Sequence, residues 1–371
     1  MTAPRDGNAI VYCEGAFGTT NGKTAHGLVR RSERYRLLSV VDSRCAGRDA
    51  GDLLDNRPTG VPVLADLEAA MADSGSRGIT PSHWIMGLAP DGGRLTPAAR
   101  DAVAQAIRAG LNVDCGLHDF LSEDSELTAL AETHGVQLRD IRKPPARQQL
   151  HGFSGKIEEV TALKVAVLGT DSAVGKRTTA WLIIDELRRR GTTAELVGTG
   201  QTAWLQGARH GIVLDSLIND FVAGEIEHAV WTAWREFDPA VIVIEGQGSL
   251  MNPAYPGGYE ILAAGRPDVV VLQHAPAREE YDGFPGYPLH PLNVQIQAIE
   301  LISGRPVVCI AVNHEGLSPA QVAMACVTIE QSVGRPACDM LLDGAGVFVD
   351  LLQRRIAEGR ATGATSKDAG S

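Results

Sequence analysis

The sequence predicts an α/β protein made of two consecutive domains, each with a parallel β-sheet. Three observations support this prediction. Short apolar runs alternate with helical stretches in both halves of the 371-residue chain. A polar, proline-containing stretch, RKPPARQQLHGFSGKIEEV, interrupts the alternation near residue 150. The chain length also fits two domains, since a typical domain holds about 150 residues.

The first half, 1–150, is predicted to be a Rossmann-like domain, because strands separated by helices of this length form parallel sheets. A helix is expected at 96–110, where Thr96 suits the N-cap, Pro97 the first turn and Gly110 the end. Strands are expected at 9–15, 35–43, 83–89, 111–116 and 136–142.

The second half, 151–359, is predicted to be a second parallel-sheet domain of the P-loop NTPase type. Its long Val/Ile runs suit strands that are covered on both faces. Strands are expected at 164–168, 194–201, 240–250, 268–275 and 305–313, with a helix at 176–190. The last residues, 360–371, are small and polar, and a disordered tail is expected there.

The stretch KVAVLGTDSAVGKRTTA, residues 164–180, predicts a phosphate-binding loop between a buried strand and a helix that begins with Lys176. The unpaired N–H groups and the dipole of a helix start bind anions, and a lysine adds a mobile positive charge. An ordinary strand–helix connection is the alternative. The expected phosphate-binding residues are Gly169, Thr170, Asp171, Ser172, Ala173, Val174, Gly175, Lys176, Arg177, Thr178 and Thr179.

The loop departs from the standard G-x4-G-K-[S/T] pattern, in which the hydroxyl binds Mg²⁺. Five residues separate Gly169 from Gly175, and Arg177 stands between Lys176 and Thr178. The displaced hydroxyl argues against a metal site. Because arginine can bind phosphate through two hydrogen bonds, the pattern favours a phosphate-rich ligand held by charge.

Polar residues at the ends of other expected strands are candidates for catalysis. Glu245 ends a buried strand and is expected to act as a general base or to hold Mg²⁺ through water. His274 ends another strand and is an acid–base candidate. The alternatives are that Glu245 caps a neighbouring helix and that His274 is structural. Substrate-binding candidates in the polar segments nearby are Gln201, Asp220, Gln247, Arg278 and Tyr281, and Arg278 suits a carboxylate.

The first half has less specific candidates. The segment 14–27 contains Lys23 but lacks a clean phosphate-loop frame. Cys115 and His118 are a conceivable nucleophile pair or metal site. Packing is the default expectation for a cysteine without partners nearby in sequence.

Composition narrows the choice of function and location. The net charge of −11 and the lack of a basic stripe argue against nucleic acid as a partner. No apolar run approaches about 18 residues, and no signal peptide is recognised, so no membrane partner is expected. Six scattered cysteines without CxxC spacing suit reduced thiols. We therefore expect a cytoplasmic protein that acts on a small molecule, and a homo-oligomer.

At this point the motifs resemble known proteins. GTDSAVGK together with VIEGQGS is similar to the dethiobiotin-synthetase class of P-loop proteins. The further segments GTGQTAWLQG, NDFVAGEIE, IEGQGSLMNPAYPG and QHAPAREEYDGFP extend a resemblance over nearly the whole chain. They resemble a bacterial family of formerly unknown function, which joins a Rossmann-like half to such a P-loop half and includes D-glutamate N-acetyltransferase.

That resemblance implies an acetyl-CoA-dependent N-acetyltransferase acting on D-glutamate or a related D-amino acid, without a metal. The loop would hold the phosphates of CoA. Glu245 or His274 would take a proton from the substrate ammonium, and Arg278 would bind the substrate carboxylate. Gln247 or a backbone N–H within 246–248 would steady the oxyanion.

Two other classes of function stay open. In an ATP- and Mg²⁺-dependent kinase or carboxylate–amine ligase, Lys176 would reach the γ-phosphate. The metal would be held by Thr178 or Thr179 with Asp171 and Glu245. A nucleotide sensor without catalysis is the third possibility. Mg²⁺ dependence and ADP release would separate the second class from the first.

Overall fold

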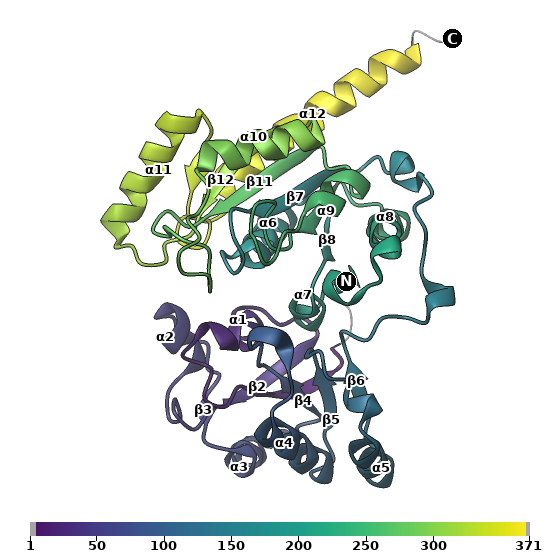
Figure 1. The fold of residues 1–371 in the computed structure, drawn as a ribbon, viewed down its shortest axis with the longest axis vertical. Coiled ribbons are helices and arrows are strands. Elements are labelled where there is room, and N and C mark those ends of the chain that lie inside the picture. The colour runs from purple at the N-terminus through teal and green to yellow at the C-terminus, as the bar shows by residue number, and fades with distance from the viewer. Residues whose placement is uncertain (1–4, 369–371) are drawn as a thin grey trace. The chain divides into compact units, whose positions relative to one another are not determined.

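The structure is a computed structural model and describes residues 5–368 (Figure 1). The chain forms two compact units. The first comprises Met1–Pro145 and Gln201–Gly207, and the second comprises Ala146–Gly200 and Ala208–Ser371. Both units are parallel-sheet α/β domains, which confirms the predicted fold class.

The first unit is built on a six-stranded parallel sheet with the order β3-β2-β1-β4-β5-β6. This is the strand order of the doubly wound Rossmann fold. The strands are β1 (Gly7–Tyr12), β2 (Tyr35–Val41), β3 (Val63–Leu64), β4 (His83–Met86), β5 (Asn112–Cys115) and β6 (Leu138–Asp140).

Helices cover both faces of this sheet. Alternate residues of a strand point to opposite faces, and here both faces carry apolar side chains that pack against helices. Ile10 and Tyr12 of β1 belong to one core cluster, and Ala9 and Val11 belong to the other. The first cluster includes α3 (Leu67–Ser76), α4 (Pro97–Arg108) and α5 (Ser125–His134). The second includes α1 (Lys23–Arg30), α2 (Ala50–Asp55) and α7 (Gln201–Gln206).

Helix α4 shows how local sequence sets an element's limits. The Thr96 side chain accepts a hydrogen bond from the Ala99 N–H, and Pro97 stands in the first turn. Gly110, just beyond the helix, has a φ of 79°, a conformation that glycine adopts without strain. The cap, the proline and the terminal glycine are all where the sequence predicts them.

The second unit has a seven-stranded parallel sheet with the order β13-β12-β11-β7-β10-β8-β9. The central strand β7 therefore lies between two strands that come much later in the chain. The strands are β7 (Leu163–Gly169), β8 (Ala194–Gly198), β9 (His210–Gly211), β10 (Val241–Glu245), β11 (Val269–His274), β12 (Val307–Val312) and β13 (Ala337–Cys338).

Two layers of helices enclose this second sheet. Helix α6 (Lys176–Arg189) packs on β7, β8 and β10, and α12 (Gly346–Asp368) packs on α6. A large apolar cluster joins the strands to four other helices. These are α8 (Asn219–Phe237), α9 (Tyr259–Ala264), α10 (Leu292–Ser303) and α11 (Pro319–Val333).

Some elements differ from the sequence-based expectation. The strand expected at 194–201 ends at Gly198, and Gln201 begins α7, which belongs to the first unit. Residues 360–368, where disorder was expected, continue α12, whereas 369–371 lie outside the described residues. The two-residue strands β3, β9 and β13 were not predicted, because two residues carry no detectable period.

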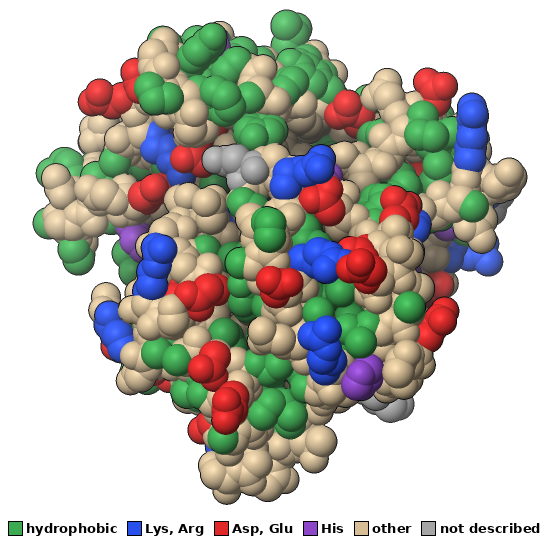
Figure 2. All heavy atoms as spheres, turned by 60° about the horizontal axis from the view of Figure 1, so that its bottom comes forward, with side chains coloured by type: hydrophobic (Ala, Val, Ile, Leu, Met, Phe, Trp, Pro, Cys, Tyr) green, Lys and Arg blue, Asp and Glu red, His purple; other side chains and the backbone are tan. Residues whose placement is uncertain are grey.

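The surface carries both signs of charge. On the face drawn in Figure 2, Lys and Arg side chains are interspersed with Asp and Glu side chains. Within residues 5–368, no helix combines the length and the apolar character needed to cross a bilayer.

Residues 151–157, which lead into the second unit, are held against α8 by hydrogen bonds and close packing. The Glu227 carboxylate is 2% exposed and accepts hydrogen bonds from Ser154 and from the Ile157 N–H. Gly224 lies directly under this segment, and a Cβ there would be 2.0 Å from the His151 carbonyl oxygen. Only glycine therefore allows the segment to lie this close to the helix.

We expect Gly224→Ala to lower the free energy of unfolding by about 2 kcal/mol or more, because the added methyl group meets backbone atoms that cannot move away. Gly75→Ala is the matched control, since a Cβ at Gly75 in α3 meets nothing within 4 Å. That control should gain about 0.5–1 kcal/mol. Urea unfolding followed by circular dichroism measures both, and equal effects of the two substitutions would contradict the packing argument.

Candidate phosphate-binding site

The carboxyl ends of three neighbouring strands form the candidate site. Strand β7 pairs with β10, where Glu245 lies opposite Val167, and with β11, where Gln273 lies opposite Gly169. The loop after β7, Glu245 and His274 are therefore brought to the same edge of the sheet. In open α/β sheets, ligands bind at this edge where the strand order reverses.

The loop 170–175 has an unusual backbone that suits an anion. Gly175 has a φ of 107°, and Ala173 also has a positive φ, 52°. Helix α6 starts after Gly175 and has no side-chain cap. Its first-turn N–H groups lack intrahelical acceptors, so they can donate to a phosphate. A Cβ at Gly169 would lie 2.9 Å from Lys176 Cδ, so this glycine makes room for the lysine stem.

The Lys176 side chain folds back over the loop. It is 8% exposed, and its Nζ donates to the carbonyl oxygens of Asp171 and Gly248, each at 2.7 Å. The ammonium therefore lies between the loop and the segment after β10. It adds a positive charge beside the uncapped start of α6.

The buried carboxylate of Asp171 holds the surrounding loops together. This side chain is fully buried and accepts four hydrogen bonds. Oδ1 accepts from the Ser172 N–H at 2.6 Å and from Asn252 Nδ2 at 2.8 Å. Oδ2 accepts from Arg278 at 3.0 Å and from the Asp282 N–H at 2.9 Å. The carboxylate thus joins the phosphate loop to the segments that follow β10 and β11.

Arg278 is engaged on both sides. Its NH1 donates to Asp171 Oδ2 and to the Ser172 carbonyl oxygen, the latter at 2.8 Å. Its Nε and NH2 donate to the Glu315 carboxylate at 3.1 and 2.7 Å. The Glu315 side chain is 52% exposed, whereas Asp171 is not exposed at all. The inner partner of Arg278 is therefore fixed, and the outer one faces solvent.

Glu245 is a buried acid next to a polar network. It is 5% exposed, and burial raises its pKa, while Arg177 and Lys176 act in the opposite direction. Oε2 accepts a hydrogen bond from the Thr199 N–H at 3.0 Å. Gln247 Nε2 donates to the Thr199 carbonyl and hydroxyl oxygens, at 2.9 and 3.0 Å. These contacts tie the ends of β8 and β10 together.

His274 lies on the other side of the loop. Its Nδ1 is 3.0 Å from the Thr170 hydroxyl oxygen. Burial lowers the pKa of His274 to about 4, so the imidazole is neutral at neutral pH.

The hydroxyl groups of the first turn of α6 differ in their surroundings. Thr179 is 4% exposed, and its hydroxyl donates to Gln273 Oε1 in the core. Thr178 is only half-buried. The sequence motif did not indicate the role of Gln273. Its place directly before His274, on the strand beside β7, is visible only in the sheet.

The glycines after β10 serve packing. A Cβ at Gly246 would lie 2.3 Å from the Val167 carbonyl oxygen, and one at Gly248 would lie 1.9 Å from the Tyr255 carbonyl oxygen. These close backbone contacts are sufficient to explain why both positions are glycine. The hydroxyl of the buried Tyr281 lies 2.7 Å from His290 Nδ1.

The structure also shows the surroundings of the remaining predicted site residues. Gln201 begins α7 in the first unit, where its side chain packs over Gly116. Asp220 is exposed in the first turn of α8. Cys115 is fully buried, and burial raises its pKa to about 12, which fits the expectation of a packed thiol. His118 is exposed.

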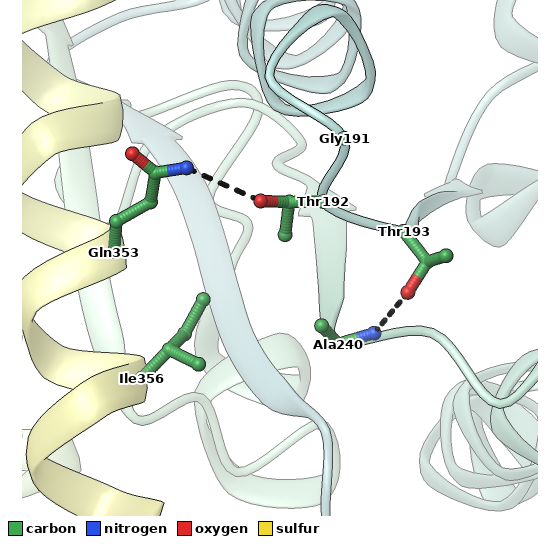
Figure 3. A pocket seen from close by; sticks show the side chains of 6 residues that line it. All are labelled: Gly191, Thr192, Thr193, Ala240, Gln353 and Ile356. Carbon is green, nitrogen blue, oxygen red and sulfur yellow. Dashed lines mark hydrogen bonds between the residues drawn. The ribbon is translucent and has the colours of Figure 1, made fainter.

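A surface hollow of about 240 Å³ lies at the opposite ends of the strands of the second sheet. Figure 3 shows Gln353 and Ile356 of α12 facing Thr192. Thr193 and Ala240, which also line the hollow, directly precede β8 and β10. The hollow is therefore at the amino ends of the strands, away from the phosphate loop.

Comparison with known proteins agrees with this architecture. A family model described as the P-loop domain of DUF1611, a domain of unknown function, matches residues 151–349, and its Rossmann-like companion matches 43–144. The chain belongs to the DUF1611 family. A crystal structure of a DUF1611 protein from Anabaena variabilis superposes with a TM-score of 0.85 at 29% identity, covering 94% of this chain and 99% of that one.

Two curated relatives carry a functional name. A D-glutamate N-acetyltransferase from Tritonibacter scottomollicae is 32% identical over 275 residues, and one from a Pseudoalteromonas species is 30% identical over 276 residues. Each alignment covers 72% of this chain and 80% of the relative. The resemblance to a two-domain P-loop family that includes such enzymes is confirmed.

In this DUF1611 protein, we expect Asp171→Asn to lower the free energy of unfolding by about 3 kcal/mol or more, because it leaves Arg278 and the Asp282 N–H without their buried acceptor. Glu315→Gln is the control, since it removes the exposed carboxylate from the same arginine and should cost less than about 1 kcal/mol. Urea unfolding measures both changes. Limited proteolysis within 275–291 should also be faster in the Asp171 variant only. Similar losses for the two variants would contradict the role of Asp171.

His274 should make folding sensitive to acid. Its folded pKa is about 4 and its ordinary value is 6.5, so the unfolded chain binds a proton first. Stability that is present above pH 6.5 is therefore lost as pH falls towards 4, by up to about 3 kcal/mol. We expect His274→Asn to lack this loss. The difference in unfolding free energy between the variant and the wild type should therefore change in favour of the variant as pH falls from 7 to 4. Urea unfolding at several pH values measures this difference, and a difference that does not change with pH would contradict a neutral, buried imidazole.

Proposed function

We propose that this protein is an N-acetyltransferase that transfers the acetyl group of acetyl-CoA to the amino group of a small amino acid, D-glutamate or a related D-amino acid. The observation that carries the proposal is the similarity to two proteins named D-glutamate N-acetyltransferase, at 32% and 30% identity over 80% of their length. The phosphate loop gives independent support for a ligand that carries phosphate groups.

CoA carries a pyrophosphate and a 3′-phosphate, and the loop offers suitable donors and charges. The uncapped first turn of α6 presents backbone N–H groups. Lys176 and Arg177 add two cations at adjacent positions. We propose that these groups bind the CoA phosphates without breaking them.

Bound acetyl-CoA would supply an electrophilic carbonyl carbon, while the amino acid arrives as an ammonium ion and must lose a proton. Glu245 and His274 are the proposed bases. A general base works best when its pKa lies near the working pH. Burial raises the pKa of Glu245, in the direction of neutral pH, and lowers the pKa of His274 to about 4. This difference favours Glu245 as the base and leaves His274 as a neutral partner of Thr170.

Arg278 is the proposed site for the acceptor carboxylate. Its inner edge is committed to Asp171, but its outer edge binds the exposed Glu315. A substrate carboxylate can replace Glu315 there with the same hydrogen-bond geometry, because both groups are carboxylates. Arg278 would then bind substrate while continuing to hold the loop.

The test is to incubate the purified protein with acetyl-CoA and a panel of D- and L-amino acids, alongside an arm containing ATP and Mg²⁺. Free thiol, ADP and product mass are measured together. We expect thiol release and an acetylated product with D-glutamate or a related D-amino acid, unaffected by EDTA. ADP formation that EDTA abolishes, without thiol release, would replace the proposal with an ATP-dependent kinase or carboxylate–amine ligase.

Replacing the loop lysine should mainly affect CoA binding. We expect Lys176→Ala to raise the KM for acetyl-CoA by about tenfold or more, because a charge-assisted hydrogen bond to phosphate is lost. Lys143→Ala, at a 42%-exposed side chain in the first unit, is the control and should leave the KM unchanged. Thiol-release kinetics measure both. An unchanged KM in a Lys176 variant with a wild-type circular dichroism spectrum would argue against the loop as the CoA site.

A further inference from the structure

The residue after the loop lysine differs from that of nucleotide-binding P-loops. In nucleotide-binding P-loops, a hydroxyl at this position binds the Mg²⁺ that accompanies the phosphates. Here Arg177 occupies the position, and Thr178 and Thr179 follow it. Successive residues of an α-helix are rotated by about 100°, so neither threonine projects where the residue after Lys176 does.

The second threonine also has another task. The Thr179 hydroxyl donates to Gln273 Oε1, and both side chains are almost fully buried, at 4% and 3% exposed. This hydrogen bond holds the Thr179 hydroxyl in the core between α6 and β11.

The carboxylate that would complete a metal site faces positive charge instead. Glu245 ends β10, next to β7, and the Thr199 N–H donates to one of its oxygens at 3.0 Å. The positive charges of Arg177 and Lys176 both lower the pKa of Glu245, and Arg177 lowers it more. Arg177 is half-buried, and its Nε atom is buried.

The donor set of this site therefore does not fit Mg²⁺. We propose that Arg177 takes the place of the divalent cation, and that the loop binds pyrophosphate esters in their metal-free form. This inference rests on the phosphate-binding part of the proposed function and not on the acetyl transfer.

Mg²⁺ and the Arg177 guanidinium would compete for the same phosphate oxygens. Mg²⁺ should therefore weaken the binding of any ligand that it chelates. ATP, with its adjacent terminal phosphates, chelates Mg²⁺ strongly. CoA, whose pyrophosphate is esterified at both ends, chelates it weakly. The site would thus prefer CoA to the magnesium complex of ATP, which is the reverse of a nucleotide-hydrolysing P-loop.

The experiment is isothermal titration calorimetry of the wild-type full chain with CoA and with ATP, each in EDTA and in excess Mg²⁺. We expect both ligands to bind in EDTA. Excess Mg²⁺ should leave the Kd of CoA unchanged and raise that of ATP by about tenfold or more. Tighter binding of ATP in Mg²⁺ than in EDTA would overturn the proposal, as would failure of both ligands to bind in EDTA.

Variants test whether Arg177 is responsible. Arg177→Thr restores the G-K-T order and should weaken binding of both ligands in EDTA by about tenfold or more. In this variant Mg²⁺ should strengthen ATP binding. Arg177→Lys keeps the charge and should keep the wild-type direction of the Mg²⁺ effect. Arg189→Thr, at a 70%-exposed side chain near the end of the same helix, is the matched control and should behave as the wild type.

The outcomes separate the two proposals. Wild-type affinity of Arg177→Thr in EDTA would overturn the role of Arg177. If that variant does not fold, as judged by circular dichroism, the wild-type titrations and Arg177→Lys still decide the question. Metal-independent binding of CoA without thiol release from acetyl-CoA would support the role of Arg177 and contradict the proposed acetyl transfer.

Discussion

The site depends on one buried charge, the carboxylate of Asp171. A fully buried carboxylate is stable only when it is paired and hydrogen-bonded, and here four donors from the loop and from the segments after β10 and β11 surround it. The need to satisfy this charge draws three segments together. The backbone carbonyl of the same residue accepts from Lys176, so the loop and its lysine are arranged by a single residue.

Close packing adds a second constraint around the same point. Gly169, Gly246 and Gly248 are each pressed against backbone or side-chain atoms at distances that exclude a Cβ. These contacts bring the loop near the ends of β7 and β10. The glycine-rich appearance of the motifs therefore reflects tight assembly of the site at least as much as access for a ligand.

Burial has opposite effects on the two candidate bases and the same consequence for the charge of the site. It raises the pKa of Glu245 and lowers that of His274, so in both cases it favours the neutral form. Lys176 and Arg177 stand at the start of α6, which has no side-chain cap. In our proposal, this edge of the sheet attracts anions, and Arg177 suits a ligand that arrives without metal.

The sequence by itself determined the local elements, because each depends on residues close together in the chain. The Val/Ile runs predicted the central strands, and the Thr96, Pro97 and Gly110 pattern predicted the limits of α4. The order of Gly169, Gly175 and Lys176 predicted the phosphate loop. The adjacent Arg177, also visible in the sequence, already argued against a standard metal site.

Tertiary structure alone decided which of these residues meet. Arg278 and Asp171 are 107 positions apart, and no local pattern indicates that they bind each other rather than a substrate. The place of β7 between β10 and β11, which brings Glu245 and His274 to the same loop, comes from strand pairing over long separations. The sequence placed Gln201 at the end of a strand of the second domain, but the residue begins a helix that packs in the first unit. Such contacts depend on how whole elements bury their apolar faces, which the residue types of a single segment do not encode.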